Sequence, residues 1–289
     1  MTATIETIAS NLGAFKTGNH WRCTCPACNY TVPTLLLKSK RGKISASCVS
    51  CNDRDAIWAA VMDAGAGARI DRSDDATAST KAAEGRAKKQ EQAVSLWNGG
   101  EALTGDCIAS VYLRRRRLDQ AIGNPALRFR ADTRHPDNRR YPAMLCRIDN
   151  VNGELIAVQR IYLADDGRKA ALDPAKAFKG PVWSGAIRFG LGAEIVVAEG
   201  PETAIAAGIL LDLPAWSAVS AGNLAKGLLL PPDIKSVVIA ADHDKPGIES
   251  AEAAFRRWKS EGRNVRIVKP NLRGDDFNDV LMRRAGGAA

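Results

Sequence analysis

The chain has 289 residues, of which 45% are hydrophobic and 25% charged, and its formal net charge is +9 at pH 7. This length accommodates two modest domains or three small ones. No apolar run approaches the roughly 20 residues of a membrane span, and the N-terminus lacks a basic stretch followed by an apolar core, which argues against a secretory signal. We therefore expect a cytoplasmic protein with no membrane partner.

The first 64 residues contain the short elements of a small domain. Ile5, Ile8 and Leu12 have helical spacing and predict an opening helix. Residues 35–39 and 44–47 flank a glycine-containing turn at 40–43, and this pattern predicts a β-hairpin. A short helix is predicted over residues 55–62.

Five of the seven cysteines lie between Cys23 and Cys51. Four of them form two Cys-x-x-Cys pairs on either side of the hairpin: Cys25, Cys28, Cys48 and Cys51. In a reducing compartment this clustering indicates a metal rather than disulfides, and the spacing is typical of a structural zinc ribbon. The alternatives are redox-active dithiols, or a zinc site in which Cys23 or, less favourably, His20 replaces Cys25. Cys107 and Cys146 lie in apolar patterns and are expected in the core.

The middle of the chain changes character twice. Residues 65–90 have almost no large apolar side chain and predict a flexible linker whose last part can be helical. Ile108, Val111 and Tyr112 then predict a helix that runs into an arginine run at 114–117. Two apolar segments, 143–148 and 155–162, flank the turn sequence at 150–153 and predict a hairpin. Residues 91–190 are therefore predicted to form a mixed α/β subdomain.

The C-terminal region alternates between strand-like and helix-like segments. The candidate strands are 194–198, 216–219, 236–241 and 264–268, and the candidate helices are 201–211, 223–229 and 247–261. The first and third strand candidates are short, β-branched and unalternating, as in strands buried on both faces. This order predicts βαβ units and a mostly parallel sheet.

Acidic residues follow the apolar runs of this region at the point where each run ends. Glu199 ends the first run, Asp242 and Asp244 end another, and Asp276 lies in the acidic segment 274–279. The carboxyl ends of adjacent parallel strands share one crevice. Carboxylates gathered there repel one another without a cation, so the pattern predicts bound Mg²⁺ or Mn²⁺. Asp275 and Asp279 are rivals of Asp276, and either could instead cap the terminal helix.

Three motifs in this acidic set carry a family resemblance. Glu199-Gly200, Asp242-His243-Asp244 and the third, Asp-containing motif resemble the Toprim domain of DnaG-type primases, topoisomerases and some nucleases. With the zinc candidate in front, the resemblance is closest to primases of phages and mobile elements, and it covers most of the chain outside the linker. It implies that the catalytic and metal-binding residues are Glu199, Asp242, Asp244 and Asp276.

The resemblance also implies a fold class and a domain order. The expected fold is α/β: a Toprim domain with a mostly parallel sheet flanked by helices, preceded by a mixed α/β basic subdomain and an N-terminal β zinc ribbon. The expected boundaries are 1–64 for the zinc ribbon, 65–90 for the flexible linker, 91–190 for the basic subdomain and 191–289 for the Toprim catalytic domain.

The basic excess of the chain lies just before the acidic region. Residues 105–190 hold sixteen Lys or Arg against nine Asp or Glu. A basic surface beside a metal site fits a polyanionic substrate, although a solvated basic surface is the alternative. Tyr112-Leu113 with the arginine run, and the basic segment 168–180, resemble elements upstream of the Toprim domain in primases. The resemblance implies that nucleic acid or NTPs are bound by Arg114, Arg115, Arg116, Arg160, Lys169 and Lys179.

Taken with these motifs, the resemblance implies a DNA primase that makes short primers on single-stranded DNA from NTPs, with structural Zn²⁺ and catalytic Mg²⁺ or Mn²⁺. The chain has no P-loop sequence, so a helicase is expected as a separate partner. A Toprim-type nuclease would use the same acids. A non-catalytic zinc-ribbon protein that binds single-stranded DNA or mediates recombination is expected to have a broken acidic set. A topoisomerase needs a large gate domain, for which the length is insufficient.

Overall fold

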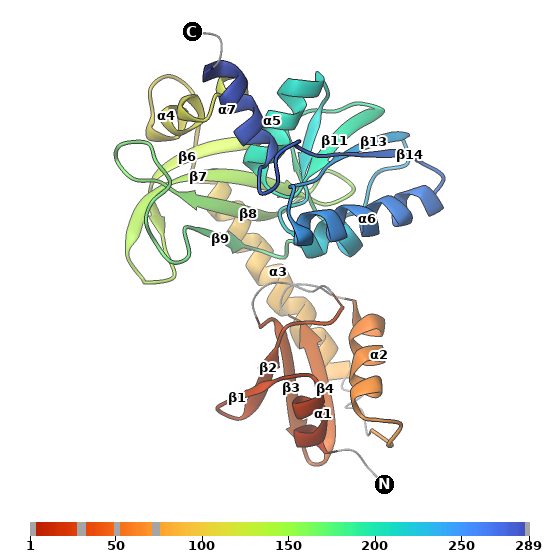
Figure 1. Cartoon of the computed structure of the whole chain (residues 1–289). Helices are drawn as coiled ribbons and strands as arrows, with labels where there is room; N and C mark the ends of the chain where they lie inside the picture. The colour runs from red at the N-terminus through yellow and green to blue at the C-terminus, as the bar shows by residue number, and fades with distance from the viewer. Residues whose placement is uncertain (1–3, 28–32, 49–52, 71–75, 287–289) are drawn as a thin grey trace. The chain divides into compact units, whose positions relative to one another are not determined.

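The computed structural model describes residues 4–27, 33–48, 53–70 and 76–286 (Figure 1). The chain divides into two compact units, Met1–Gly85 and Arg86–Ala289. Cys28 and Cys51, two of the four expected zinc ligands, lie outside the described residues.

The N-terminal unit contains one antiparallel sheet. Its strands, in spatial order, are β1 (Phe15–Thr17), β2 (His20–Cys23), β3 (Leu35–Lys40) and β4 (Lys43–Cys48). Helices α1 (Ile5–Asn11) and α2 (Arg54–Ala64) contact the sheet and each other. The expected opening helix, hairpin and following helix are all present, and Gly42 supplies the positive φ of 76° that the hairpin turn requires.

Helix α3 (Ala76–Asn98) begins earlier than the last part of the predicted linker, where a helix was expected. The difference has a physical reason, because Ala, Glu, Lys and Gln are strong helix formers even where no apolar stripe is present. Near its end, Ala93 and Trp97 are buried against the neighbouring sheet. Along the described ranges, no helix combines the length and hydrophobicity needed to cross a bilayer.

The second unit begins with an antiparallel sheet in the order β5-β6-β7-β8-β9. The strands are β5 (Glu101–Ala102), β6 (Leu127–Arg134), β7 (Arg140–Asp149), β8 (Leu155–Tyr162) and β9 (Lys176–Lys179), with α4 (Ile108–Arg115) and the short η1 (Asp119–Ala121) between β5 and β6. The predicted hairpin is confirmed as β7–β8, and its turn contains Gly153 at a φ of 84°.

A second five-stranded sheet follows in the order β10-β12-β11-β13-β14. It is built from β10 (Ile187–Arg188), β11 (Glu194–Ala198), α5 (Pro201–Leu211), β12 (Ala215–Ser217), η2 (Asn223–Gly227), β13 (Ser236–Ala240), α6 (Lys245–Ser260), β14 (Asn264–Val268) and α7 (Phe277–Gly286). Only β10 is antiparallel to its neighbour. The predicted, mostly parallel sheet is confirmed; η2 is a single π-helical turn instead of an α-helix.

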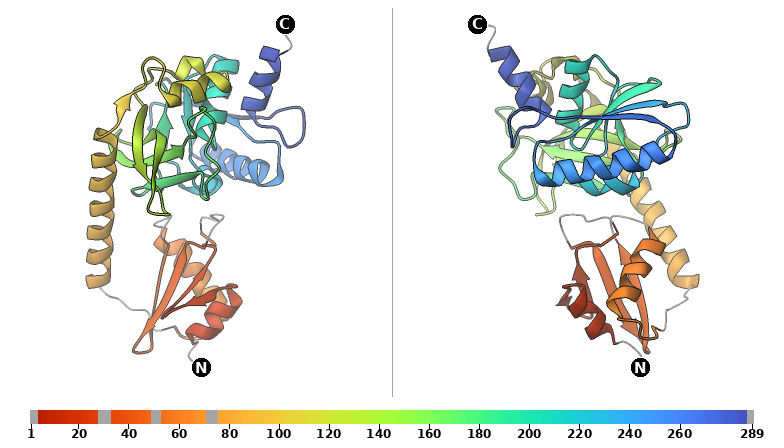
Figure 2. Two further views of the ribbon diagram at one scale, coloured as in Figure 1. Left: turned by 90° about the vertical axis from the view of Figure 1, so that its left-hand side faces the viewer. Right: turned by 45° about the vertical axis from the view of Figure 1, so that its right-hand side comes forward.

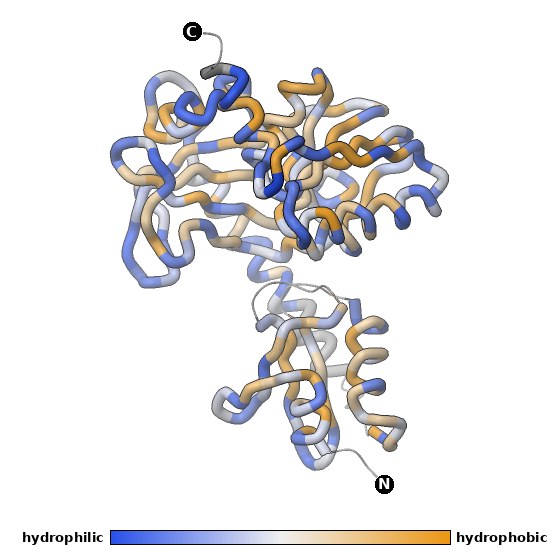
Figure 3. Tube along the Cα trace, in the orientation of Figure 1, coloured by the Kyte–Doolittle hydropathy of each residue, from blue (hydrophilic) through white to orange (hydrophobic). Residues whose placement is uncertain are grey.

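The central strands of this sheet are buried on both faces, as their unalternating sequences predict. Ile195 and Val197 face the core under α6, whereas Val196 and Ala198 face the core under α5 and α7. Figure 2 shows α6 lying along one face of the sheet. Hydrophobic residues accordingly follow the central strands, and hydrophilic residues recur along α6 (Figure 3).

The predicted boundary near residue 190 does not separate two cores. One hydrophobic cluster contains Met144 and Ile161 of the antiparallel sheet together with Val196, Ala204 and Phe277 of the C-terminal region. Strand β10, which precedes the expected boundary, is an edge strand of the C-terminal sheet. The two sheets therefore form one compact unit, and this shared core holds the basic residues and the acidic residues in a defined relation.

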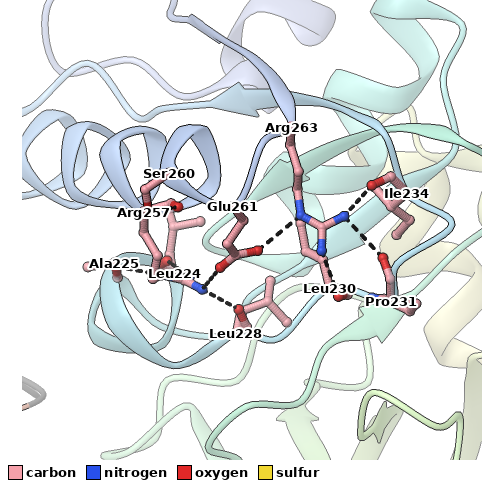
Figure 4. A network of polar contacts seen from close by, with 10 residues as sticks. All are labelled: Leu224, Ala225, Leu228, Leu230, Pro231, Ile234, Arg257, Ser260, Glu261 and Arg263. Atoms are coloured by element: carbon pink, nitrogen blue, oxygen red, sulfur yellow. Dashed lines mark hydrogen bonds and ion pairs between the residues drawn. The ribbon is translucent and has the colours of Figure 1, made fainter.

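Two arginines fix the connection between η2 and β13 (Figure 4). Arg257 donates from Nη1 to the carbonyl oxygen of Leu228 at 2.8 Å, and Arg263 donates from Nη2 to that of Leu230 at 2.9 Å. Glu261 lies between them, with its carboxylate 3.0 Å from Nε of Arg263. Buried backbone carbonyls need hydrogen-bond donors, and these side chains supply them on the α6 side of the sheet.

Candidate active site

The acidic residues meet because β11 and β13 are parallel neighbours that end at the same level. Ala198 pairs with Ala240 at the last position of the ladder. Glu199 follows β11 directly, and Asp242 comes two residues after β13. The carboxyl ends of these strands form the crevice in which open α/β sheets bind ligands.

Asp242 is the centre of this acidic set. Burial and the nearby carboxylates of Glu199, Asp276 and Asp244 raise the pKa of Asp242 to about 7. Its Oδ1 atom is buried and has no hydrogen-bond partner in the structure. A buried, unpartnered carboxylate oxygen surrounded by further carboxylates is costly unless it protonates or meets a cation.

Asp244 and Asp276 each begin a helix. Asp244 is the N-cap of α6, and its Oδ1 accepts a hydrogen bond from the backbone N–H of Gly247 at 2.7 Å. Asp276 accepts from the N–H of Asp279 at 2.9 Å through Oδ1, while Oδ2 lies 3.4 Å from the Thr203 hydroxyl that donates to it. Each cap is made through one carboxylate oxygen only.

A pair of backbone hydrogen bonds brings the third acidic motif to the second. His243 donates its N–H to the carbonyl oxygen of Asp275 at 2.9 Å, and Gly274 donates to that of His243 at 2.8 Å. The side chain of Asp275 pairs with Arg283, and Asp279 caps the backbone N–H of Asp276. Of the three rival aspartates, Asp276 is therefore the one whose charge acts on Asp242.

Glu199 is held by the end of β12 and by the loop that follows it. The Ser217 hydroxyl donates to the backbone carbonyl of Glu199 at 2.7 Å, and the N–H of Ala221 donates to its carboxylate. Burial is the main reason that the pKa of Glu199 is raised. Val219 in this loop has a φ of 63°, which costs a β-branched residue about 1–3 kcal/mol. Such strain occurs where surrounding structure requires a fixed loop.

The donor set fits a hard divalent cation. All four side chains offer carboxylate oxygens, the ligands that Mg²⁺ prefers, and Asp242 presents an oxygen that lacks any other partner. Within the described residues, no three side chains of His, Cys, Asp or Glu are already gathered into a metal-binding cluster. The four residues therefore suit a divalent cation because each supplies carboxylate oxygens and because their charges act on one another.

Lys176 was not among the residues selected for phosphate binding, yet it is the cation that acts on the acidic set. Its positive charge lowers the pKa values of Glu199 and Asp242, against the effect of burial. Strand periodicity in the sequence could have separated these two lysines. Lys176 and Lys179 are three positions apart on β9, so their side chains leave opposite faces of the sheet.

Glu202, in the first turn of α5, connects the two sheets. It accepts a hydrogen bond from the Tyr112 hydroxyl at 2.5 Å, and Nζ of Lys169 lies 3.3 Å from the same oxygen. These partners outweigh burial and lower the pKa of Glu202 to about 2. Lys169 is thereby held beside the first turn of α5.

We expect Glu202→Gln to destabilise the protein by about 1–3 kcal/mol at pH 7, because the neutral amide leaves Lys169 without its counter-charge. A carboxyl with a lowered native pKa contributes stability above its unfolded value near 4.5, and this contribution is lost as the pH falls toward about 2. Urea unfolding across that window measures the difference. Glu252→Gln, which removes an exposed pair with Arg256, should change stability by less than about 0.5 kcal/mol; equal loss in both variants would contradict the prediction.

The predicted arginine run divides into three environments at the end of α4. Arg114 pairs with Asp106 at 2.7 Å. Arg116 lies over the Tyr112 ring and donates to Oδ1 of Asn278 at 3.0 Å, which ties α4 to α7. Arg115 and Arg117 are exposed. Their charges are therefore the ones in the run that are most directly available to a ligand.

Arg160 and Lys179 lie on the other face of the antiparallel sheet from Lys176. Residues paired across β8 and β9 point to the same face of the sheet. Arg160 pairs with Ala177, which belongs to the core under α3. Lys176 pairs with Ile161, which belongs to the core shared with the C-terminal sheet. The six basic residues that the resemblance selected thus do not form one surface.

The described cysteines of the N-terminal unit lie near one end of its sheet. Register places Cys23 and Cys48 in the same row, on either side of Leu35 of β3. Cys25 follows two residues after the end of β2 and is buried. Burial and the neighbouring Cys48 raise the pKa of the Cys23 thiol. Strand register therefore brings Cys23 near Cys48, the start of the second pair, while Cys107 and Cys146 lie in the other unit.

Two segments of the second unit match known protein families. Residues 87–189 match a family described as a domain of unknown function (DUF7146), and residues 194–287 match the family described as Toprim domain. A comparison with curated proteins found no match.

Several solved structures are similar to the chain at low identity. A DNA primase domain from Pseudomonas aeruginosa is 20% identical, with a TM-score of 0.45 over 69% of this chain and 77% of that one. A DnaG primase catalytic domain bound to ssDNA is 16% identical, with a TM-score of 0.49 over 71% and 81%. The Aquifex aeolicus primase, with zinc-binding and RNA polymerase domains, is 13% identical, with a TM-score of 0.48 over 98% and 80%.

The family match, the mostly parallel sheet and the acidic residues at its strand ends agree with one another. The second of the matched segments, residues 194–287, is a Toprim domain.

Proposed function

We propose that the protein is a DNA primase, which joins nucleotides from NTPs into short primers on single-stranded DNA. One observation carries the proposal: Glu199, Asp244 and Asp276 surround Asp242, whose buried Oδ1 atom has no partner. The match of residues 194–287 to the family described as Toprim domain supports the proposal. The basic subdomain that shares its core supplies the charge expected of a polyanion-binding enzyme.

In this proposal Asp242, Asp244 and Asp276 hold Mg²⁺ or Mn²⁺, with Glu199 beside them. When bound, the ion supplies electrostatic stabilisation of the charge that develops on the triphosphate during nucleotidyl transfer. Glu199, whose pKa burial raises, is suited to accept a proton from the attacking 3′-hydroxyl. Lys176, whose charge acts on Glu199 and Asp242, would bind phosphate oxygens of the incoming nucleotide, and Lys169, held beside Glu202, would assist it.

The single-stranded template would be bound by the basic subdomain and the N-terminal hairpin, with NTPs at the carboxylates. A separate helicase would expose the template. The N-terminal unit would hold structural Zn²⁺ through Cys25, Cys28, Cys48 and Cys51.

Binding to single-stranded DNA should weaken steeply as salt rises, because phosphate contacts release counterions. Arg115→Glu should lower the affinity and reduce the slope of log affinity against log salt by about one. Arg256→Glu on α6, in an exposed pair with Glu252, makes the same charge change away from the antiparallel sheet and serves as the control. Fluorescence anisotropy with a labelled oligonucleotide measures both. An affinity that does not change with salt concentration would show that the positive charge of the protein does not bind nucleic acid.

A Toprim-type nuclease uses the same acidic set and is the second candidate. Labelled NTPs, single-stranded DNA and Mg²⁺ in one reaction, run beside a cleavage assay on the same DNA, separate the two activities. Extension products without cleavage support the primase. Cleavage without products assigns the carboxylates to hydrolysis.

A further inference from the structure

Arg116, at the end of α4, is held by two hydrogen bonds to one side chain of α7. Nη1 of Arg116 donates to Oδ1 of Asn278 at 3.0 Å, and Nδ2 of Asn278 donates to the backbone carbonyl of Arg116 at 2.8 Å. Asn278 is buried, with 3% of its surface exposed. Because the amide donates to and accepts from the same residue, the pair fixes both side chains and joins α4 to α7.

The residue that this pair holds lies two positions after Asp276, in the first turn of α7. Phe277, between them, is buried in the core that the two sheets share. Asp276 is also bonded to the same turn, since its carbonyl accepts from the N–H of Val280 at 3.3 Å and its Oδ1 from the N–H of Asp279 at 2.9 Å. The position of this turn therefore determines the position of the Asp276 carboxylate.

A second path of contacts leads from α4 to Asp276 through α5. The guanidinium of Arg116 lies 5.1 Å from the centre of the Tyr112 ring, and the Tyr112 hydroxyl donates to Glu202 at 2.5 Å. Thr203, the next residue of α5, is buried, and its hydroxyl donates to Oδ2 of Asp276 at 3.4 Å. The path through α5 reaches one carboxylate oxygen of Asp276, and the turn of α7 binds the other.

The other arginines of the run have different surroundings. Arg115 is exposed, and Arg114 pairs with an exposed aspartate, Asp106. Arg116 is half-buried, with its guanidinium against an aromatic ring and one terminal nitrogen bonded to Asn278. The resemblance gave the three arginines one role, whereas their contacts separate Arg116 from the other two.

We propose that Arg116 is a positioning residue for Asp276, and not a contact of nucleic acid. It acts through Asn278 on the turn that carries Asp276, and through the path that ends at Thr203. This inference rests on the proposed function, because it concerns a carboxylate that would hold Mg²⁺ or Mn²⁺. Residues that orient a metal ligand from outside commonly affect metal affinity by about 10–100-fold. Helix α4, which precedes the Toprim domain in the chain, would therefore set the geometry of its carboxylates.

Binding of Mn²⁺ to the full-length protein as purified tests the proposal without nucleotide or DNA. Electron paramagnetic resonance measures the free ion, and the site is defined as the binding that Asp242→Asn abolishes. Arg116→Gln and Asn278→Ala should each lower the Mn²⁺ affinity of this site by about tenfold. Arg256→Gln, in an exposed pair with Glu252 on α6, makes the same charge change as Arg116→Gln and should leave the affinity unchanged.

The direction of the change separates positioning from an effect of charge. Loss of a positive charge near a cation site strengthens cation binding, so Arg116→Gln would raise the Mn²⁺ affinity if charge alone acted. Asn278→Ala leaves the charge unchanged. A fall in affinity in both variants therefore reports a displaced carboxylate. Arg116→Lys, which keeps the charge and a donor, should recover part of the loss.

Binding of a labelled single-stranded oligonucleotide separates positioning from direct contact. Arg115→Gln should lower the DNA affinity, whereas Arg116→Gln should leave it near the wild-type value. The proposal is wrong if Arg116→Gln lowers the DNA affinity severalfold, or if the Mn²⁺ affinity stays unchanged in both Arg116→Gln and Asn278→Ala. Far-UV circular dichroism verifies folding, and Thr203→Val, which removes one hydroxyl, replaces Asn278→Ala if that variant fails to fold.

The outcome is independent of which reaction the carboxylates perform. Both measurements are made without NTPs, so a protein that makes no primers can still show the Mn²⁺ loss in Arg116→Gln. Conversely, unchanged Mn²⁺ affinity in Arg116→Gln leaves the primase proposal standing, because that proposal depends on the carboxylates around Asp242.

Discussion

Asp242→Asn should lower primer synthesis by several orders of magnitude while the protein remains folded and, without divalent metal, becomes more stable at neutral pH. The amide keeps the shape of the side chain and removes one charged oxygen ligand. Loss of a metal-binding oxygen removes charge stabilisation that acts only as the reaction proceeds, so the rate falls more than substrate binding. Glu199→Gln should lower synthesis similarly.

The gain in stability follows from the raised pKa of Asp242. The native value is about 7, whereas an unfolded aspartate titrates near about 3.9. Between these two values the native state keeps a proton that the unfolded state has released, so metal-free wild-type protein loses stability as the pH rises from about 4 to about 7, by up to about 4 kcal/mol. The asparagine variant lacks this titration. It should match or exceed wild type at pH 8, and the difference should shrink toward pH 4.

Thermal unfolding without added Mg²⁺ or Mn²⁺ at several pH values, beside a primer-synthesis assay, measures both effects. Asp212→Asn is a matched control, because Asp212 is the left-handed C-cap of α5, at the end of that helix remote from Glu199. Asparagine suits that conformation, so the control should keep its activity. Near wild-type synthesis by Asp242→Asn would remove this residue from the mechanism. If the stability difference between Asp242→Asn and wild type does not change with pH, the carboxyl of Asp242 is not crowded by neighbouring carboxylates.

Removal of zinc should unfold the N-terminal unit while the second unit stays folded. We expect one zinc per chain after purification without added metal, and loss of the metal in Cys25→Ser and Cys48→Ser. The free energy of a structural zinc site, about 10 kcal/mol or more, is comparable to the whole stability of a small domain. The thin core between one sheet and two short helices offers little to replace it.

Elemental analysis gives the stoichiometry, and hydrogen exchange reports which unit opens after chelation. Cys107→Ser, in the other unit, should keep the zinc. Cys23→Ser decides whether that cysteine takes part, since β-sheet register places it in the row of Cys48. Folded protein with zinc near zero would overturn the assignment, and exchange that rises equally in both units would contradict separate stabilities.

The sequence by itself determined the parts of the fold that depend on local periodicity. The unalternating runs at 194–198 and 236–240 are strands buried on both faces, and the turn at 150–153 closes a hairpin. It also placed Glu199 and Asp242 at neighbouring strand ends, because parallel βαβ units bring those ends together. The helix over 76–90 was underestimated, since a polar, alanine-rich segment carries helix propensity without an apolar stripe.

Only the tertiary structure decided which residues meet across elements distant in sequence. Backbone hydrogen bonds between His243 and the 274–275 loop selected Asp276 over its rivals. Glu202 reached Tyr112, 90 positions earlier, through a core shared by both sheets. Lys176 and Lys179 leave opposite faces of β9, so Lys176 lies near the carboxylates whereas Lys179 lines a pocket on the other face. The sequence shows which residues are charged but not which residues they contact. Those contacts depend on strand register and on how the two sheets pack, which residues distant in sequence determine.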